Sequence, residues 1–212
     1  MLVLALACTN PDRGDLETAS LYAVGDSILE WHLGEGSIPE VMAEALDQPM
    51  YNAAVSGAHF LDGEGESIPS QLSTGAWQWL LVDGGGNDVN DRCECGDCDA
   101  VLDAIVSADG STGALPDFAR EVADAGTEVL IMGYYGLPDG AEFGFDRCGE
   151  ELEVLSQRQA ALADSSDRIH FADAREVVDG TDEAMYDDDL VHPSVEGSAV
   201  VGRFLAEFIQ AL

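Results

Sequence analysis

Short apolar runs alternate with amphipathic stretches along the chain, a pattern that predicts strands alternating with helices. The apolar runs predict five strands, over residues 20–24, 49–53, 77–84, 127–135 and 168–173. The run TEVLIMGYY at 127–135 is continuous, as expected of a central strand that is buried on both faces. Helical patterns cover residues 28–46, 98–108, 114–125, 149–164 and 194–211, and a further helix is expected within 67–76.

Strands that alternate with helices imply a parallel sheet covered by helices on both faces. We therefore expect an α/β protein with three α/β/α layers, built on a flavodoxin-like, doubly wound, five-stranded parallel sheet of order 2-1-3-4-5. The length of 212 residues fits one such domain, at 20–212, preceded at 1–19 by the remnant of a lipoprotein signal and a polar linker. In sheets of this kind, functional residues collect beyond the carboxyl ends of the strands.

Four polar motifs lie at those positions. Gly25-Asp26-Ser27 follows the first strand, Ser56-Gly57 the second, and GGGND (84–88) the third, while DDDLVHPS (187–194) precedes the last helix. Each motif alone has a structural explanation. Ser27 could cap a helix, Asn87 could stabilise a turn, and the acidic loop could bind calcium.

Taken together and in this order, the motifs resemble those of the SGNH hydrolases, also called the GDSL family, over residues 20–212. The resemblance implies that Ser27 is a nucleophile, that His192 is its general base and that Asp189 orients His192. It also implies an oxyanion hole formed by the backbone N–H groups of Ser27 and Gly57 and the side-chain amide of Asn87.

Further residues of the motifs and loops are expected near this site. Asp26 should orient the nucleophile turn, and Asp88 should fix the loop of Asn87. The side chains that could line the pocket are Asp26, His59, Tyr134 and Tyr135. No cofactor and no metal is expected.

The resemblance implies a carboxylic ester hydrolase that forms an acyl-enzyme intermediate. Because the chain has no long apolar insertion to cover the site, short-chain or soluble esters are favoured. The expected substrate is an ester of a small molecule or of a carbohydrate, and the protein is expected to be a monomer. Two alternatives stay open. One is an acyltransferase or deacetylase acting on carbohydrate, and the other is a non-catalytic, glycan-binding surface lipoprotein.

The cysteines indicate an exported protein. The start MLVLALAC resembles the end of a lipoprotein signal, with Cys8 as the lipidated residue and the membrane anchor. The other four, Cys93, Cys95, Cys98 and Cys148, could form two disulfides or a four-thiolate zinc site. Export favours disulfides, and we expect one of them to link the loops after the third and fourth strands.

The charge balance bears on partners and habitat. The chain has 42 acidic residues against 8 basic ones, all arginine, for a net charge of -34. This excludes nucleic acid, whose binding needs lysine and arginine against the phosphates. It also excludes electrostatic attraction to an anionic membrane. We interpret the acidity as adaptation to salt or as a compositional bias of the lineage.

Adaptation to salt makes a prediction. The melting temperature should rise between low salt and about 1 M NaCl, because the Debye length falls to about 3 Å and the repulsion between carboxylates is screened. Thermal unfolding followed by circular dichroism at the two salt concentrations measures the effect. A melting temperature that does not change with salt would contradict the interpretation.

Overall fold

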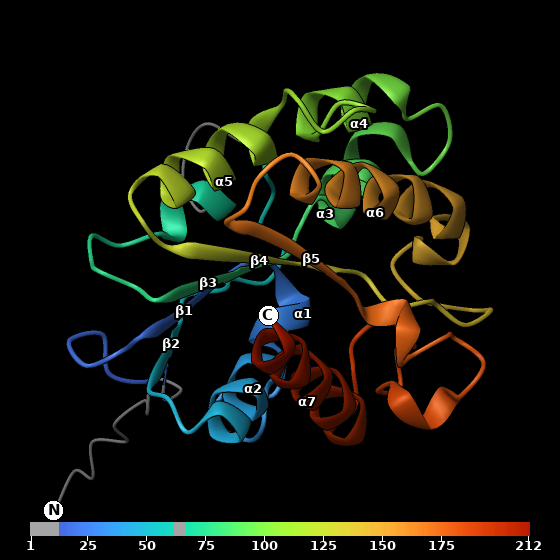
Figure 1. Cartoon of the computed structure of the whole chain (residues 1–212). Coiled ribbons are helices and arrows are strands. Elements are labelled where there is room, and N and C mark those ends of the chain that lie inside the picture. The colour runs from blue at the N-terminus through green and yellow to red at the C-terminus, as the bar shows by residue number, and fades with distance from the viewer. Residues whose placement is uncertain (1–12, 62–66) are drawn as a thin grey trace, which may run out of the picture.

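The computed structural model describes residues 13–61 and 67–212. Its centre is a five-stranded parallel sheet of order β2-β1-β3-β4-β5 (Figure 1). The strands are β1 (Leu21–Val24), β2 (Met50–Asn52), β3 (Trp79–Val82), β4 (Glu128–Gly133) and β5 (Ile169–Asp173). Both the fold class and the strand order expected from the sequence are confirmed. The proposed lipidation site Cys8 lies outside the described residues.

Helices cover both faces of the sheet, which gives the three expected layers (Figure 1). On one face lie α2 (Ile38–Leu46) and α7 (Val195–Ala211), which pack against each other. On the other face lie α3 (Gly86–Cys93), α4 (Asp99–Ile105), α5 (Ala114–Asp124) and α6 (Gly149–Ala163). Short 3-10 turns span Ile68–Gln71, Phe145–Arg147, Ala174–Glu176 and Glu183–Met185. None of the described helices is long and apolar enough to cross a bilayer.

The structure corrects two helix predictions and contains one helix that was not predicted. The single helix expected over 28–46 is two helices, because α1 (Ser27–Glu30) ends after one turn and α2 begins only at Ile38. Positive φ angles at His32, Gly34 and Gly36 turn the chain between them. Within 67–76 only the turn at Ile68–Gln71 forms. Helix α3 was not predicted, because its glycine-rich start reads as a turn.

The described part of the predicted N-terminal linker contacts the domain. The guanidinium of Arg13 donates hydrogen bonds of 2.9 Å to the backbone oxygens of Asn52 and Ala54 and pairs with Glu30 at 2.8 Å. Gly14 forms an isolated antiparallel bridge with Tyr51 on β2. These contacts place Arg13 and Gly14 along β2, at the edge of the sheet.

The four cysteines of the domain form two disulfides, Cys93–Cys98 and Cys95–Cys148. The second links Cys95, two residues after α3, to Cys148, the residue before α6, and so joins the segments that follow β3 and β4. The expected link between these loops is confirmed, and no thiolate is left for the alternative zinc site. Disulfides are typical of proteins that fold in an oxidising compartment.

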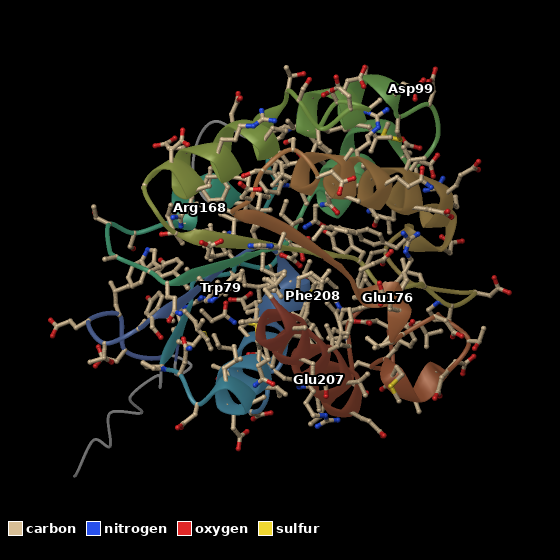
Figure 2. The ribbon with its side chains drawn as sticks, in the orientation of Figure 1. Trp79, Asp99, Arg168, Glu176, Glu207 and Phe208 are labelled. Atoms are coloured by element: carbon tan, nitrogen blue, oxygen red, sulfur yellow. A yellow bond between two sulfur atoms is a disulfide. The ribbon has the colours of Figure 1, made fainter. Side chains whose placement is uncertain are left out.

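Most carboxylates lie on the surface, as Figure 2 shows for Asp99 on α4 and Glu207 on α7. Among the described residues, three acidic side chains are buried, namely Asp26, Asp83 and Asp88. Asp26 and Asp83 lie just beyond the carboxyl ends of β1 and β3, which are neighbouring strands, and Asp88 lies in the first turn of α3, the helix that follows β3. Buried carboxylates are rare unless they have partners, so this edge of the sheet is chemically distinct.

Asp26 and Asp83 form a buried acidic pair. The backbone N–H of Asp26 donates to Asp83 Oδ1 at 3.0 Å, while no described residue forms a hydrogen bond with Oδ2. A Cβ atom on Gly25 would lie 1.7 Å from Asp83 Oδ1, so only glycine fits beside this carboxyl. Burial, followed by the charge of Asp26, raises the pKa of Asp83 well above its usual value.

The two disulfides should differ in their contribution to stability. They close segments of 53 and 5 residues, so the chain-entropy model gives losses of about 4 and about 2 kcal/mol on removal. We expect the double variant Cys95→Ser/Cys148→Ser to lose more unfolding free energy than Cys93→Ser/Cys98→Ser. Urea denaturation in molar NaCl measures both, and equal losses would contradict the model.

The acidic pair should make stability depend on pH. Because the pKa of Asp83 is raised in the folded state, its favourable contribution is complete below its unfolded pKa and is lost as the pH rises through the folded pKa. Asp83→Asn keeps an acceptor oxygen and removes the ionisation. We expect this variant to become more stable than wild type towards neutral pH, because wild type must there either keep a proton on Asp83 or bury its charge.

The comparison needs a matched control. Asp97→Asn removes an exposed carboxylate and should follow the wild-type dependence of unfolding free energy on pH. Denaturant unfolding at several pH values between about 4 and 8 gives the three curves. If the unfolding free energy of Asp83→Asn changes with pH in the same way as that of wild type, the acidic pair does not control the pH dependence of stability.

Candidate active site

Ser27 is the first residue of α1 and follows β1 directly. The side chain of Asp26 caps this helix by accepting a hydrogen bond from the N–H of Ile28 at 2.9 Å. The side-chain amide of Gln71 binds both backbone groups of Gly25, accepting from its N–H and donating to its C=O at 2.8 Å each. The turn that carries Ser27 is therefore fixed from both sides.

A hydrogen-bonded chain connects the three residues expected to form a triad. Nε2 of His192 lies 2.8 Å from Oγ of Ser27, and Nδ1 lies 2.6 Å from Oδ2 of Asp189. Because Asp189 can only accept at that contact when ionised, Nδ1 carries the proton and the lone pair of Nε2 faces the serine hydroxyl. Residues separated by 165 positions in the sequence are thus brought together.

Asp189 is held in its ionised form. Its Oδ1 accepts hydrogen bonds of 2.9 Å from the backbone N–H groups of Val191 and His192. Burial opposes ionisation, but these bonds and the one from the His192 ring outweigh it and lower the pKa of Asp189. The fold of this short loop therefore supplies a negative charge on the far side of the imidazole from Ser27.

The residues expected to form the oxyanion hole line the same cavity as Ser27. Gly57 has a φ of 76°, a conformation that favours glycine, and Asn87 lies in the first turn of α3. The Asn87 amide is oriented by a 3.0 Å hydrogen bond from Nδ2 to the C=O of Ala58. Within the described chain, the backbone N–H groups of Ser27 and Gly57 donate no hydrogen bond.

Asp88 fixes the loop of Asn87, as expected. Its carboxylate accepts hydrogen bonds from the backbone N–H groups of Phe60 at 2.8 Å and Leu61 at 3.1 Å. Burial raises the pKa of Asp88 against the opposing effect of these bonds. The segment that follows β2 is thereby joined to the start of α3, and Gly57 and Asn87 are held close to each other.

Tyr134 connects the nucleophile turn to the start of α3. Its hydroxyl donates to Oδ2 of Asp26 at 2.5 Å and accepts from the N–H of Gly86 at 3.0 Å. Burial, and after it the charge of Asp26, raises the pKa of Tyr134 well above its usual value. The hydroxyl stays protonated and serves as a structural donor.

A cavity of about 340 Å³ opens over these groups. Of the four side chains expected to line it, Asp26, Tyr134 and Tyr135 do so and His59 does not. The ring of His59 contacts Asp91, a lining residue, at 3.0 Å. The walls are mainly apolar and aromatic, with Ile28, Trp31, Leu137, Phe143, Phe145, Leu152 and Val191 among the lining residues.

Phe143 lies at the mouth of this cavity and is 64% exposed. Its φ of 58° is unusual for a residue other than glycine, and its C=O accepts a 3.0 Å hydrogen bond from the side chain of Asn90. Residues other than glycine that are held at such a φ tend to cluster at functional sites.

Three residues of the site were not predicted from the sequence. Gln71 fixes Gly25 from a separate loop and carries no local signal. Trp31 stacks on His192, and Asp187 accepts the indole N–H of Trp31 at 2.5 Å. Trp31 could have been predicted from its position four residues after Ser27. The carboxylates of Asp187 and Asp189 are thus engaged with side chains, and no metal-binding group occurs among residues 13–61 and 67–212.

Solved structures with the same fold include several esterases. Est24, a carbohydrate acetylesterase from Sinorhizobium meliloti, superposes with a TM-score of 0.68 at 16% identity, covering 91% of this chain and 99% of that one. A carbohydrate acetylesterase family member from the same organism gives 0.66 at 22% identity, covering 91% and 98%. A catalytic mutant of Axe2, an acetylxylan esterase from Geobacillus stearothermophilus, gives 0.61 at 18%, covering 90% and 94%.

Sequence comparison gives the family. No curated protein matches the chain. The model of the GDSL-like lipase/acylhydrolase family matches residues 23–200, a range that contains Ser27, Gly57, Asn87, Asp189 and His192. The chain therefore belongs to the GDSL-like lipase/acylhydrolase family, the SGNH hydrolases.

Proposed function

We propose that this protein is a carboxylic ester hydrolase in which Ser27 is the nucleophile, His192 the general base and Asp189 the residue that orients the base. The observation that carries the proposal is the continuous hydrogen-bonded chain from Asp189 through both ring nitrogens of His192 to the Ser27 hydroxyl. A serine hydroxyl needs such a base, because it is a weak nucleophile at its free pKa.

In the acylation step, Oγ of Ser27 attacks the ester carbonyl carbon while Nε2 of His192 takes the hydroxyl proton. The carbonyl oxygen becomes an oxyanion, for which the N–H groups of Ser27 and Gly57 and Nδ2 of Asn87 are the donors. One such donor contributes about 2.7–4 kcal/mol to transition-state stabilisation. His192 then gives the proton to the leaving alcohol as the C–O bond breaks, and Ser27 remains acylated.

Deacylation repeats the sequence with water. His192 takes a proton from the water molecule, the hydroxide adds to the acyl carbon, and the same donors bind the second oxyanion. Collapse of this intermediate breaks the bond to Oγ of Ser27 and returns the proton to it. Asp189 stabilises the imidazolium in both steps through its contact with Nδ1.

A neutral, short-chain or soluble ester fits the cavity best. Its volume of about 340 Å³ is at the lower end of ligand pockets, and none of its lining residues is a lysine or an arginine that would pair with an anionic group. The net charge of -34 also disfavours anionic substrates at low salt.

Deacetylation of carbohydrate is a second candidate. Its support is that Est24 and Axe2, described as a carbohydrate acetylesterase and an acetylxylan esterase, share this fold. The mouth of the cavity also carries Asn90, Asp91 and the exposed ring of Phe143, groups suited to sugar hydroxyls and to the apolar face of a sugar ring. Release of acetate from acetylated xylan distinguishes this activity from hydrolysis of simple esters.

The same proposal places the protein outside the cytoplasm. Its two disulfides support export into an oxidising compartment. Attachment to the cell envelope through Cys8 remains our expectation from the sequence, and palmitate labelling of wild type against Cys8→Ala tests it.

Hydrolysis of p-nitrophenyl esters from acetate to decanoate, in molar NaCl, tests the proposed reaction. We expect kcat/KM to fall by at least about 10³-fold in Ser27→Ala, because the nucleophile is lost. Ser165→Ala, at the end of α6, is the matched control and should keep wild-type rates. The chain-length profile reports the size of the acyl site.

The outcome is decisive in either direction. Wild-type rates in Ser27→Ala, or hydrolysis in neither protein, would contradict a serine esterase. In that case product analysis with acceptor alcohols would test the acyltransferase, and binding of glycans would test the non-catalytic alternative.

A further inference from the structure

The imidazole of His192 contacts two aromatic side chains besides its polar partners. The indole of Trp31 stacks on it with ring centroids 3.8 Å apart and planes inclined by 10°. The ring of Phe143 lies edge-on, with centroids 6.2 Å apart. Only 8% of His192 is exposed, so the ring is largely shielded from water.

Trp31 is itself held by the loop that carries His192. Its indole N–H donates to Oδ2 of Asp187 at 2.5 Å. The backbone N–H of Asp187 in turn donates to the C=O of His192 at 2.9 Å. The backbone of His192 therefore helps to hold Asp187 in place, and Asp187 in turn holds the Trp31 indole that stacks on the His192 imidazole.

The chain around Trp31 is shaped to permit this contact. The N–H of Trp31 donates to the C=O of Ser27 at 2.8 Å, so the indole is tied to the helix turn of the nucleophile. The next residue, His32, has a φ of 59° and ends the helix there. A left-handed residue other than glycine is uncommon and collects at functional sites. This break is the one that divides α1 from α2.

We propose that Trp31, fixed by Asp187, is a positioning residue that holds the His192 ring in line with Ser27 and stabilises its imidazolium form. The inference rests on the proposed function, in which His192 becomes protonated in each chemical step. A cation within about 6 Å of an indole centroid is attracted by the electron density of the ring. The carboxylate that accepts the indole N–H increases that density, because hydrogen-bonded groups polarise one another.

Other charged and titratable groups also face His192. They are Asp189 and Asp187 on its own loop and Asp26 and Ser27 at the nucleophile turn. Two further groups act through neighbours of His192: Nε2 of His32, after α1, lies 3.3 Å from Oδ2 of Asp187, and the hydroxyl of Tyr135, after β4, donates to the C=O of Val191 at 2.8 Å. Asp189 attracts the imidazolium most directly. Variants of Trp31 leave all of these charges in place and therefore isolate the contribution of the indole.

The three consecutive aspartates 187–189 provide a matched set of variants. Asp187→Asn removes the charge that holds Trp31, while Asp188→Asn removes the same charge from the neighbouring exposed side chain. Trp31→Leu removes the aromatic face and keeps apolar bulk. Trp31→Phe keeps a flat ring and loses the indole N–H.

With p-nitrophenyl acetate in molar NaCl, we expect kcat to fall by about 3- to 30-fold in Trp31→Leu, with a smaller change in KM. Trp31→Phe should recover most of this loss. The acid limb of the kcat/KM profile should move to lower pH in Trp31→Leu, because the protonated base is then less stabilised. Asp187→Asn should shift in the same direction, and Asp188→Asn should match wild type.

Tryptophan fluorescence gives a readout that needs no activity. A protonated imidazole stacked on Trp31 should quench its emission, so the wild-type signal should fall with decreasing pH. We expect the part of this fall that comes from Trp31 to disappear in Trp31→Phe and in His192→Gln, to diminish in Asp187→Asn and to persist in Asp188→Asn. Trp77 and Trp79 remain in every variant, and Trp79 lies against His170 with ring centroids 5.4 Å apart, so the signal of Trp31→Phe at each pH is subtracted as their background.

Wild-type kcat and an unshifted acid limb in folded Trp31→Leu would overturn the inference while leaving Ser27-dependent hydrolysis intact. Equal effects of Asp187→Asn and Asp188→Asn would also overturn it. Such a result would mean that Asp187 acts only through its negative charge and not by holding Trp31. Should Trp31→Leu fail to fold, the acid limb of Asp187→Asn compared with that of Asp188→Asn decides the question. If wild type hydrolyses no ester, the proposed function fails, and the fluorescence titration alone decides the inference.

Discussion

The chain runs from β1 outward to β2 and then back across β1 to β3, so the carboxyl ends of β1 and β3 lie side by side. The rest of the site depends on this adjacency. A hydrogen bond from the N–H of Asp26 to the Asp83 carboxyl joins the two strand ends directly, and Tyr134 extends the connection to α3. Reversals of strand order are where open parallel sheets bind ligands, and here both Ser27, the proposed nucleophile, and Asn87 follow the strands at the reversal.

Acidic residues divide into two populations with different physical roles. Most of the 42 lie on the surface, where solvent and salt determine their energetic effect. The three buried ones surround the site and are held by backbone N–H groups and a tyrosine hydroxyl. Composition alone reveals the first population. The second becomes visible only when the strands are paired.

The sequence predicted what depends on local pattern and on spacing along the chain. Apolar runs identified the five strands, and the motifs identified Ser27, Asn87 and His192 as neighbours. It did not predict the break after α1, since a short helix ended by a left-handed histidine differs little in pattern from a continuous one. It also did not predict Gln71 or Asp187 as partners of the site, because each acts across loops whose meeting is set by tertiary packing.

The disulfide between Cys95 and Cys148 lets one wall of the cavity vary while the geometry of the site stays fixed. It ends the segment that carries Phe143 and Phe145, and β4 begins that segment within the rigid sheet. With both ends covalently or structurally fixed, the residues between them can change in length and sequence at little cost to the sheet or to the Ser27–His192 geometry. If the proposed function holds, substrate preference can therefore diversify in this one wall of the cavity while the positions of Ser27 and His192 stay unchanged.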